Sequence, residues 1–256
     1  MAMEPILNQA AKLRYMFSGK ARVPLVVRAP GGGGRGNAAQ HSQSLEAWFI
    51  HIPGLKVAVP STPADAKGLA KTVIRDDNPV IFLEHKALYF TKGTVPADEY
   101  TIPFGQARIC RPSRHVTIVC IHTMVGKTLR AAEVLSREGI EAEVIDPRIL
   151  VPLNIESIAG AVKRTSRLVV FHEAPECGGV AGEIAMQVMD RTFDLLDAPI
   201  VCVYGKNTLM PYSESLEHAA LPQTDDVVRA VRGLLHYPNT PVVQRGPSDR
   251  GSAGTA

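Results

Sequence analysis

Short apolar runs alternate with helix-like segments along most of this chain. The first block predicts strand, helix, strand, helix and strand at residues 23–27, 42–52, 55–60, 64–75 and 79–85. Runs such as VTIVC and LVVF are apolar throughout, which is typical of parallel strands that are covered on both faces. The alternation therefore predicts an α/β protein built from doubly wound parallel sheets.

Turn formers divide this alternation into two domains. Three prolines and several charged residues between 91 and 113 indicate a linker. A second block repeats the pattern, with strands predicted at 115–121, 141–147, 167–174 and 199–205 and helices at 124–139, 154–165, 179–196 and 224–235. We expect domains at residues 1–90 and 114–237, and a disordered tail at 238–256, which is rich in proline, glycine and serine.

Charge and composition exclude several classes of partner. The formal net charge of +3 comes from acids and bases that alternate, without the basic cluster typical of nucleic-acid binding. No apolar run is long enough for a membrane span or a secretory signal. The four cysteines show no CxxC spacing, which favours small buried side chains in a reducing compartment. We therefore expect a cytoplasmic protein that binds neither nucleic acid nor membrane.

A glycine-rich loop follows the first predicted strand. Gly31, Gly33 and Gly36 satisfy the GxGxxG pattern of dinucleotide-binding folds. The next strand, at 55–60, ends without the acidic residue that would bind a ribose, and the segment before the helix is too long to bring a helix N-terminus to a pyrophosphate. The pattern favours a tightly turning loop that delivers residues 38–43, AAQHSQ, to a partner surface.

With this loop, residues 23–61 resemble the beta subunit of thiamine-diphosphate-dependent 2-oxo acid dehydrogenases, the E1 component. The resemblance continues through residues 60–89, 143–153 and 172–185. It implies a partial transketolase-like pyrimidine-binding domain followed by a transketolase C-terminal domain. It also implies an α2β2 assembly in which an alpha subunit holds thiamine diphosphate and Mg²⁺, and an E2 lipoyl acyltransferase that accepts the acyl group.

His41 is the candidate catalytic residue. The resemblance places the active-site histidine of the family at this position of AAQHSQ, and an imidazole exchanges protons near neutral pH. Gln40 and Ser42 are the candidate cofactor-binding neighbours. The alternatives are structural: His41 would hydrogen-bond the backbone at a helix start, and Ser42 or Ser44 would cap the helix that follows.

The segment TVIRDDNP is a candidate ion site. A helix end leaves carbonyl oxygens free, and such oxygens bind hard cations. By resemblance, a structural potassium ion would be held by Leu25, Val73, Ile74, Asp76 and Asn78. The alternative is an ordinary helix C-terminus.

The other histidines are weaker candidates for catalysis than His41. His51 is expected to be structural, and His85 to lie in a cleft or in surface pairs at a strand end. His172 and Glu173 also end a strand, but no nucleophile elbow such as GxSxG accompanies them. Small residues at 178–183 favour subunit packing there.

The predicted function is that of an E1 beta subunit that takes part in oxidative decarboxylation of pyruvate. Acetoin dehydrogenase and branched-chain 2-oxo acid dehydrogenase beta subunits share the same motifs and are the alternatives. By resemblance, residues 1–20 begin inside an interior helix of the family's first domain, so the front half of that domain, with the glutamate that contacts the aminopyrimidine, has no counterpart here. The chain is therefore also consistent with a non-catalytic, partner-binding remnant, and an unpaired sheet edge predicts poor solubility without a partner.

Overall fold

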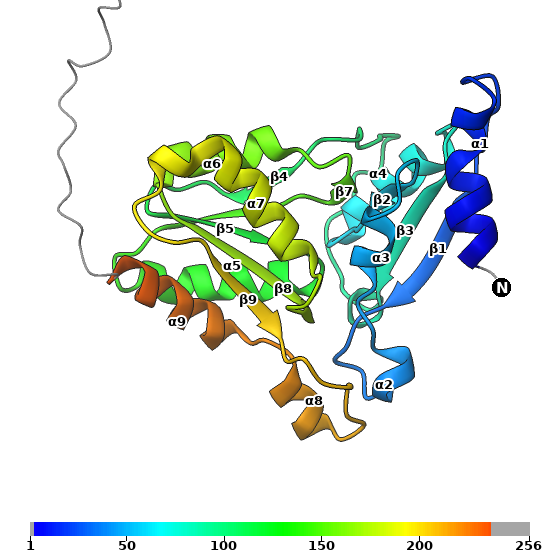
Figure 1. Ribbon diagram of the computed structural model, residues 1–256. Helices are drawn as coiled ribbons and strands as arrows, with labels where there is room; N and C mark the ends of the chain where they lie inside the picture. Colours follow the sequence, from blue (N-terminus) through cyan, green and yellow to red (C-terminus); the bar gives the residue numbers. More distant parts are fainter. Residues whose placement is uncertain (1–2, 237–256) are drawn as a thin grey trace, which may run out of the picture.

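Two sheets lie side by side in the computed structural model, which describes residues 3–236 (Figure 1). The predicted tail at 238–256 lies outside the described residues. The predicted mixed α/β class with two largely parallel sheets is confirmed. Within residues 3–236, no helix is long and apolar enough to cross a membrane.

The first sheet has the strand order β1-β3-β2-β7. Its strands are β1 (Val26–Gly31), β2 (Lys56–Ala58), β3 (Val80–His85) and β7 (Ile149–Val151). A π-helical turn, η1 (Pro5–Ala10), runs into α1 (Ala11–Met16), and these two cover one face with α3 (Glu46–Ile50). The other face packs against α4 (Pro63–Ile74). Because both faces are covered, β3 is apolar almost throughout.

The second sheet has the order β4-β6-β5-β8-β9. Its strands are β4 (Arg108–Arg111), β5 (Val116–Cys120), β6 (Ala142–Asp146), β8 (Leu168–Pro175) and β9 (Val201–Gly205). One face packs on α5 (Thr123–Ser136) and α9 (Thr224–Leu235), and the other on α6 (Ile155–Thr165) and α7 (Val180–Thr192). Short helical turns, η2 (Lys86–Leu88) and η3 (Phe193–Leu195), follow β3 and α7.

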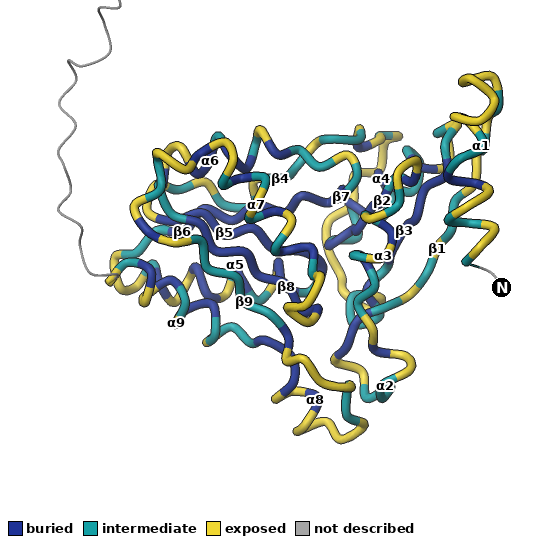
Figure 2. Tube along the Cα trace, viewed as in Figure 1, coloured by how far each residue is buried: buried dark blue, intermediate teal, exposed yellow. Residues whose placement is uncertain are grey.

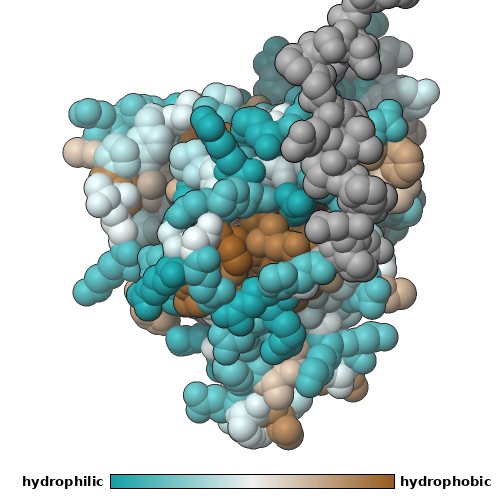
Figure 3. Space-filling model, turned by 90° about the vertical axis from the view of Figure 1, so that its left-hand side faces the viewer, coloured by the Kyte–Doolittle hydropathy of each residue, from teal (hydrophilic) through white to brown (hydrophobic). Residues whose placement is uncertain are grey.

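One hydrophobic core joins the two halves. It contains Val57 and Ile81 from the first sheet together with Val119 and Val170 from the second. The buried strands form a nearly continuous band across the molecule, while the helix surfaces remain exposed (Figure 2). The face at the left of Figure 1 is mostly hydrophilic around one central apolar area (Figure 3). The two halves therefore share one interior.

Two short strands were not predicted from the sequence. β7 leaves the second half and pairs antiparallel with β2, with Val57 opposite Val151. β4 lies within the predicted linker 91–113 and pairs antiparallel with β6 at the edge of the second sheet. Each strand has only three or four residues, so periodicity carries little signal for it.

Candidate active site

The glycine-rich loop and the short helix that follows it project from the body of the molecule. The loop leads from β1 into α2 (Ala38–His41), and α8 (Glu214–Ala220) projects beside it (Figure 1). Backbone angles explain the glycines, because Gly32, Gly34 and Gly36 have φ values of +81°, +82° and +63°. At Gly32 a Cβ atom would lie 2.1 Å from Nε2 of His85, so only glycine fits there.

Two carboxylates of the C-terminal half hold this loop. Glu217 of α8 accepts the amide of Gly34 at 2.8 Å with one oxygen and the amide of Gly36 at 2.9 Å with the other. Glu173, at the end of β8, accepts the amide of Gly33 at 3.1 Å and the hydroxyl of Ser44 at 2.8 Å. Both carboxylates are buried. The segment that carries His41 is therefore fixed on both sides by charge-assisted hydrogen bonds.

Glu173 is also the centre of a buried polar cluster. His85 Nε2 lies 2.8 Å from its second oxygen, and the Thr123 hydroxyl donates to the same oxygen at 3.1 Å. Burial raises the pKa of Glu173, but the interactions with His85, Ser44 and the Gly33 amide outweigh burial and lower the pKa to about 2. Glu173 is therefore a carboxylate at every physiological pH.

A second buried carboxylate, Glu46, lies between two histidines. His122 Nε2 is 3.3 Å from one oxygen of Glu46, and His172 Nε2 is 3.6 Å from the other. Burial raises the pKa of Glu46, yet these imidazoles hold it well below its ordinary value. The ring of His122 lies 5.5 Å from that of His85, measured between centroids. The two carboxylates and three histidines therefore form one cluster between the halves.

His122 adopts a backbone conformation that side chains rarely take. Its φ is +54° and its ψ is −128°, although it is not glycine. Strain of this kind persists where surrounding contacts hold the residue in place, and it is common at functional sites. Here the contact is the pairing of the buried imidazole with Glu46.

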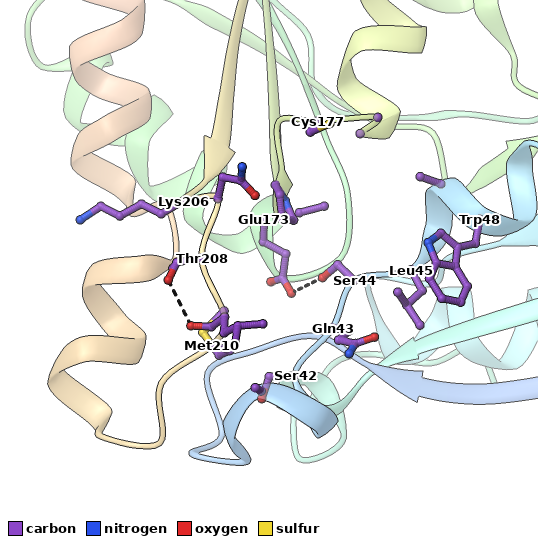
Figure 4. Close-up of a pocket in the computed structure, with 18 of the residues that line it drawn as sticks. Ser42, Gln43, Ser44, Leu45, Trp48, Glu173, Cys177, Lys206, Thr208 and Met210 are labelled. Carbon is purple, nitrogen blue, oxygen red and sulfur yellow. Dashed lines mark hydrogen bonds between the residues drawn. The ribbon is translucent and has the colours of Figure 1, made fainter.

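A cavity of about 930 Å³ opens beside the cluster. It lies between the segment that leads into α3 and the loops that follow β8 and β9 (Figure 4). Its lining is mostly apolar, including Trp48 and Met210, with Cys177 and Lys206 among the polar groups. Ser42 lines it too, and its Oγ atom is buried and has no hydrogen-bond partner among the described residues. A buried hydroxyl without a partner fits a site that receives a polar ligand group.

The predicted site residues differ in their surroundings. Gln40 and His41 are exposed on α2, whereas Ser42 is buried and is one of the residues that line the cavity. The suggestion that Ser44 caps the next helix is wrong, because Leu45 occupies the cap position and Ser44 donates to Glu173 instead. His85 does not make a surface pair but is buried against Glu173.

The residues predicted to hold potassium gather at the end of α4: Leu25, Val73, Ile74, Asp76 and Asn78. The carbonyl of Val73 accepts the Asp76 amide at 3.3 Å. The Asp76 carboxylate accepts the Asn78 side chain and pairs with Lys56, which lowers the pKa of Asp76 despite partial burial. A cation here would therefore be held by main-chain carbonyls of the helix end, and the potassium assignment stays a prediction. Within residues 3–236, no cluster of three or more His, Cys, Asp or Glu side chains is arranged to hold a metal.

Sequence reasoning missed Glu46, His122 and Glu217 as site residues. Glu46 is a single acidic residue within a predicted helix, and His122 follows an apolar strand without a motif. The position of His122 could have indicated the cluster. His85, His122 and Glu173 all follow or end strands, and parallel strands bring such residues to the same edge of a sheet. Spacing along the chain gave no indication that these residues contact each other.

Comparison with known families agrees with this architecture. Residues 2–92 match the transketolase pyrimidine binding domain, and residues 105–227 match the transketolase C-terminal domain. A solved structure described as a split gene transketolase, an inactive beta4 tetramer, has the same fold, with a TM-score of 0.73 at 24% identity over 92% of this chain and 71% of its own.

Similar curated proteins identify the family within this fold. The beta subunit of acetoin:2,6-dichlorophenolindophenol oxidoreductase from Bacillus subtilis is 48% identical over 92% of this chain and 69% of its own length. The beta subunit of the pyruvate dehydrogenase E1 component from Rickettsia felis is 47% identical, with coverages of 92% and 72%. The mitochondrial subunit beta-2 of the pyruvate dehydrogenase E1 component from Oryza sativa subsp. japonica is 44% identical over 90% of this chain and 62% of its own length. The chain thus spans 62–72% of the length of these relatives, and it belongs to the E1 beta subunit family of pyruvate and acetoin dehydrogenases.

Proposed function

We propose that this chain acts as the beta subunit of a thiamine-diphosphate-dependent E1 component, together with an alpha subunit. The observation that carries the proposal is the placement of AAQHSQ. Two buried carboxylates hold its flanks, and it brings Ser42 to the wall of a large cavity while His41 stays accessible. An exposed histidine next to a cavity is suited to proton transfer to a group that enters from a partner chain.

The described residues fit the cofactor through the unpartnered hydroxyl of Ser42. Bound thiamine diphosphate would supply the carbanion chemistry of decarboxylation, and its Mg²⁺ would be held by the alpha subunit. In this chain, His41 donates or accepts the proton at the reacting oxygen, and Ser42 orients a polar group of the ligand. The apolar wall that includes Trp48 and Met210 excludes water from the reacting centre.

Pyruvate is the proposed substrate, and the acyl group passes to the lipoyl group of an E2 acyltransferase in the cytoplasm. Relatives named for pyruvate and for acetoin are about equally similar, with 47% and 48% identity. Acetoin is therefore the second candidate, and both fit the same site chemistry.

The test is reconstitution of the complex. The tagged chain is co-purified with its native alpha subunit, loaded with thiamine diphosphate and Mg²⁺, and assayed with pyruvate, acetoin and branched-chain 2-oxo acids. We expect turnover of pyruvate and a decrease in kcat of about 10²-fold or more in His41→Ala. The control is His218→Ala, an exposed histidine on α8, which should keep full activity. Turnover of none of the substrates would contradict the proposed function, and a fully active His41→Ala variant would contradict the role of His41.

A further inference from the structure

The place of His41 depends on a residue that lies far away in the chain. The four residues of α2 are joined to the body by the glycine loop before them and by residues 42–45 after them. On the downstream side, Ser44 donates to Glu173, and the Gln43 carbonyl accepts the Gly32 amide at 2.9 Å. On the upstream side, the residues nearest to α2 with a bond to the C-terminal half are Gly34 and Gly36, and both donate to Glu217.

We propose that Glu217 is a positioning residue that sets the place of His41 by clamping the two amides of the glycine loop. The proposal rests on the catalytic role of His41 proposed above. Glu217 itself does not touch the cavity, since it is absent from the lining. Its effect on the reaction is therefore transmitted through the loop.

The geometry of the clamp requires both carboxylate oxygens. Each oxygen takes one amide, at 2.8 Å and 2.9 Å, and the side chain is only 3% exposed. The two amides belong to glycines with positive φ. Because glycine adopts positive and negative φ about equally readily, the loop needs an external partner to hold one backbone path. Glutamate can satisfy both donors at once, whereas glutamine offers one acceptor and turns an N–H₂ group towards the second amide.

The α8 helix also provides a matched control. Glu214 lies one turn earlier on the same helix and is exposed. The substitution Glu214→Gln therefore removes the same charge from the same helix without touching the loop. Glu217→Asp keeps a carboxylate with a shorter reach, and it serves as the conservative variant.

The first measurement is amide hydrogen exchange of the whole chain, read by mass spectrometry on peptides covering residues 31–45. We expect Glu217→Gln to speed exchange in this segment by about tenfold or more, because two bonds to a buried charge are disrupted. Peptides of β5 should keep their protection, and Glu214→Gln should match the wild type. The exchange rate in Glu217→Asp should lie between those of the wild type and Glu217→Gln. Unchanged exchange in the 31–45 peptides of Glu217→Gln would overturn the clamp. If that variant does not fold, unchanged exchange in Glu217→Asp would overturn it equally.

The second measurement is activity of the complex with the alpha subunit. We expect Glu217→Gln to lower kcat about tenfold or more with a smaller change in KM, since proton transfer by His41 is affected most, while Trp48 and Met210 of the cavity wall lie outside the loosened segment. Glu217→Asp should recover part of kcat. A normal kcat despite faster exchange would overturn the positioning role while leaving the clamp in place. The failure of the proposed function is recognised separately, because it requires His41→Ala to be fully active or the complex to turn over none of the substrates.

Discussion

At the residue scale, the surroundings of Asp146 disfavour a negative charge. Asp146 is fully buried at the end of β6, and Asp65 beside it is also buried. Burial, together with the charge of Asp65, raises its pKa to about 6, although Arg108 approaches to 3.6 Å and the Arg148 amide donates at 2.9 Å. The folded state therefore retains a proton on Asp146 under mildly acidic conditions in which the unfolded chain has lost it.

This retained proton predicts a pH-dependent stability. The pKa of Asp146 rises from 3.8 in the unfolded chain to about 6 in the fold, so its contribution favours the folded state at low pH and is lost as pH rises from about 4 to 6. A difference of two units corresponds to about 3 kcal/mol. Asp146→Asn has no carboxyl group to titrate at this position, so it does not lose this contribution as pH rises. The free energy of unfolding of the variant minus that of the wild type should therefore increase from pH 4 to pH 7.

Urea unfolding at several pH values measures this difference. The control is Asp77→Asn, because the side chain of Asp77 is exposed and pairs with Arg22 at the surface. A difference between Asp146→Asn and wild type that is constant from pH 4 to pH 7 would show that Asp146 titrates normally.

Among the structural elements, the glycine loop has three residues with positive φ: Gly32, Gly34 and Gly36. Gly32 and Gly34 have nearly the same φ, +81° and +82°, but different surroundings. A Cβ at Gly32 meets the His85 ring, whereas at Gly34 the nearest atom is a methyl group of Leu221 at 3.9 Å. Comparing alanine substitutions at Gly32 and Gly34 therefore separates the cost of backbone strain from the cost of steric overlap.

We expect Gly34→Ala to cost about 1 kcal/mol of unfolding free energy, the cost of placing a side chain at positive φ. Gly32→Ala carries the same cost and must also displace His85 from Glu173, which adds about 1–3 kcal/mol. Chemical denaturation of both variants tests this order. Equal losses would mean that the His85 ring moves away freely, and that its contact with Glu173 contributes little.

The extent to which elements were predictable follows from their length and burial. β3, β5 and β8 are long apolar runs bounded by turn formers. α5 ends at Ser136, three residues before the predicted end, and Gly139, whose φ is +78°, lies in the turn that follows. β4 and β7 are short, lie at the edges of their sheets and pair antiparallel, so neither apolar continuity nor helix spacing marks them.

The candidate site was predictable only in part. AAQHSQ was recognisable because it is contiguous, but its supports come from Glu173 and Glu217, more than a hundred residues away. Glutamates on helices and at strand ends are ordinary in solvent, and only the fold shows that these two are buried against backbone amides. Long-range pairing of this kind leaves no trace in local spacing.

In the whole molecule, the two halves are bound together by three independent features. The main hydrophobic core draws from both sheets, β7 crosses to pair with β2, and Glu173 of the second half bonds Ser44 and His85 of the first. Separation of the halves would expose apolar surface and leave a buried carboxylate without its donors. Such an interface favours unfolding of both halves in one cooperative step.

Each half contains a probe of this cooperativity. Trp48, the chain's single tryptophan, reports on α3, and Cys120 is buried in β5 and reacts with thiol reagents only after the second sheet opens. We expect the urea midpoints from Trp48 fluorescence and from peptide-resolved labelling of Cys120 to coincide. Glu173→Gln should lower both midpoints together, because it removes one partner of a buried pair. We expect the free energy of unfolding to fall by about 3–5 kcal/mol. The control is Glu176→Gln, which changes a nearby exposed residue and should leave both midpoints unchanged. Two separate midpoints in the wild type would show that the halves unfold independently and that the shared core contributes little to their coupling.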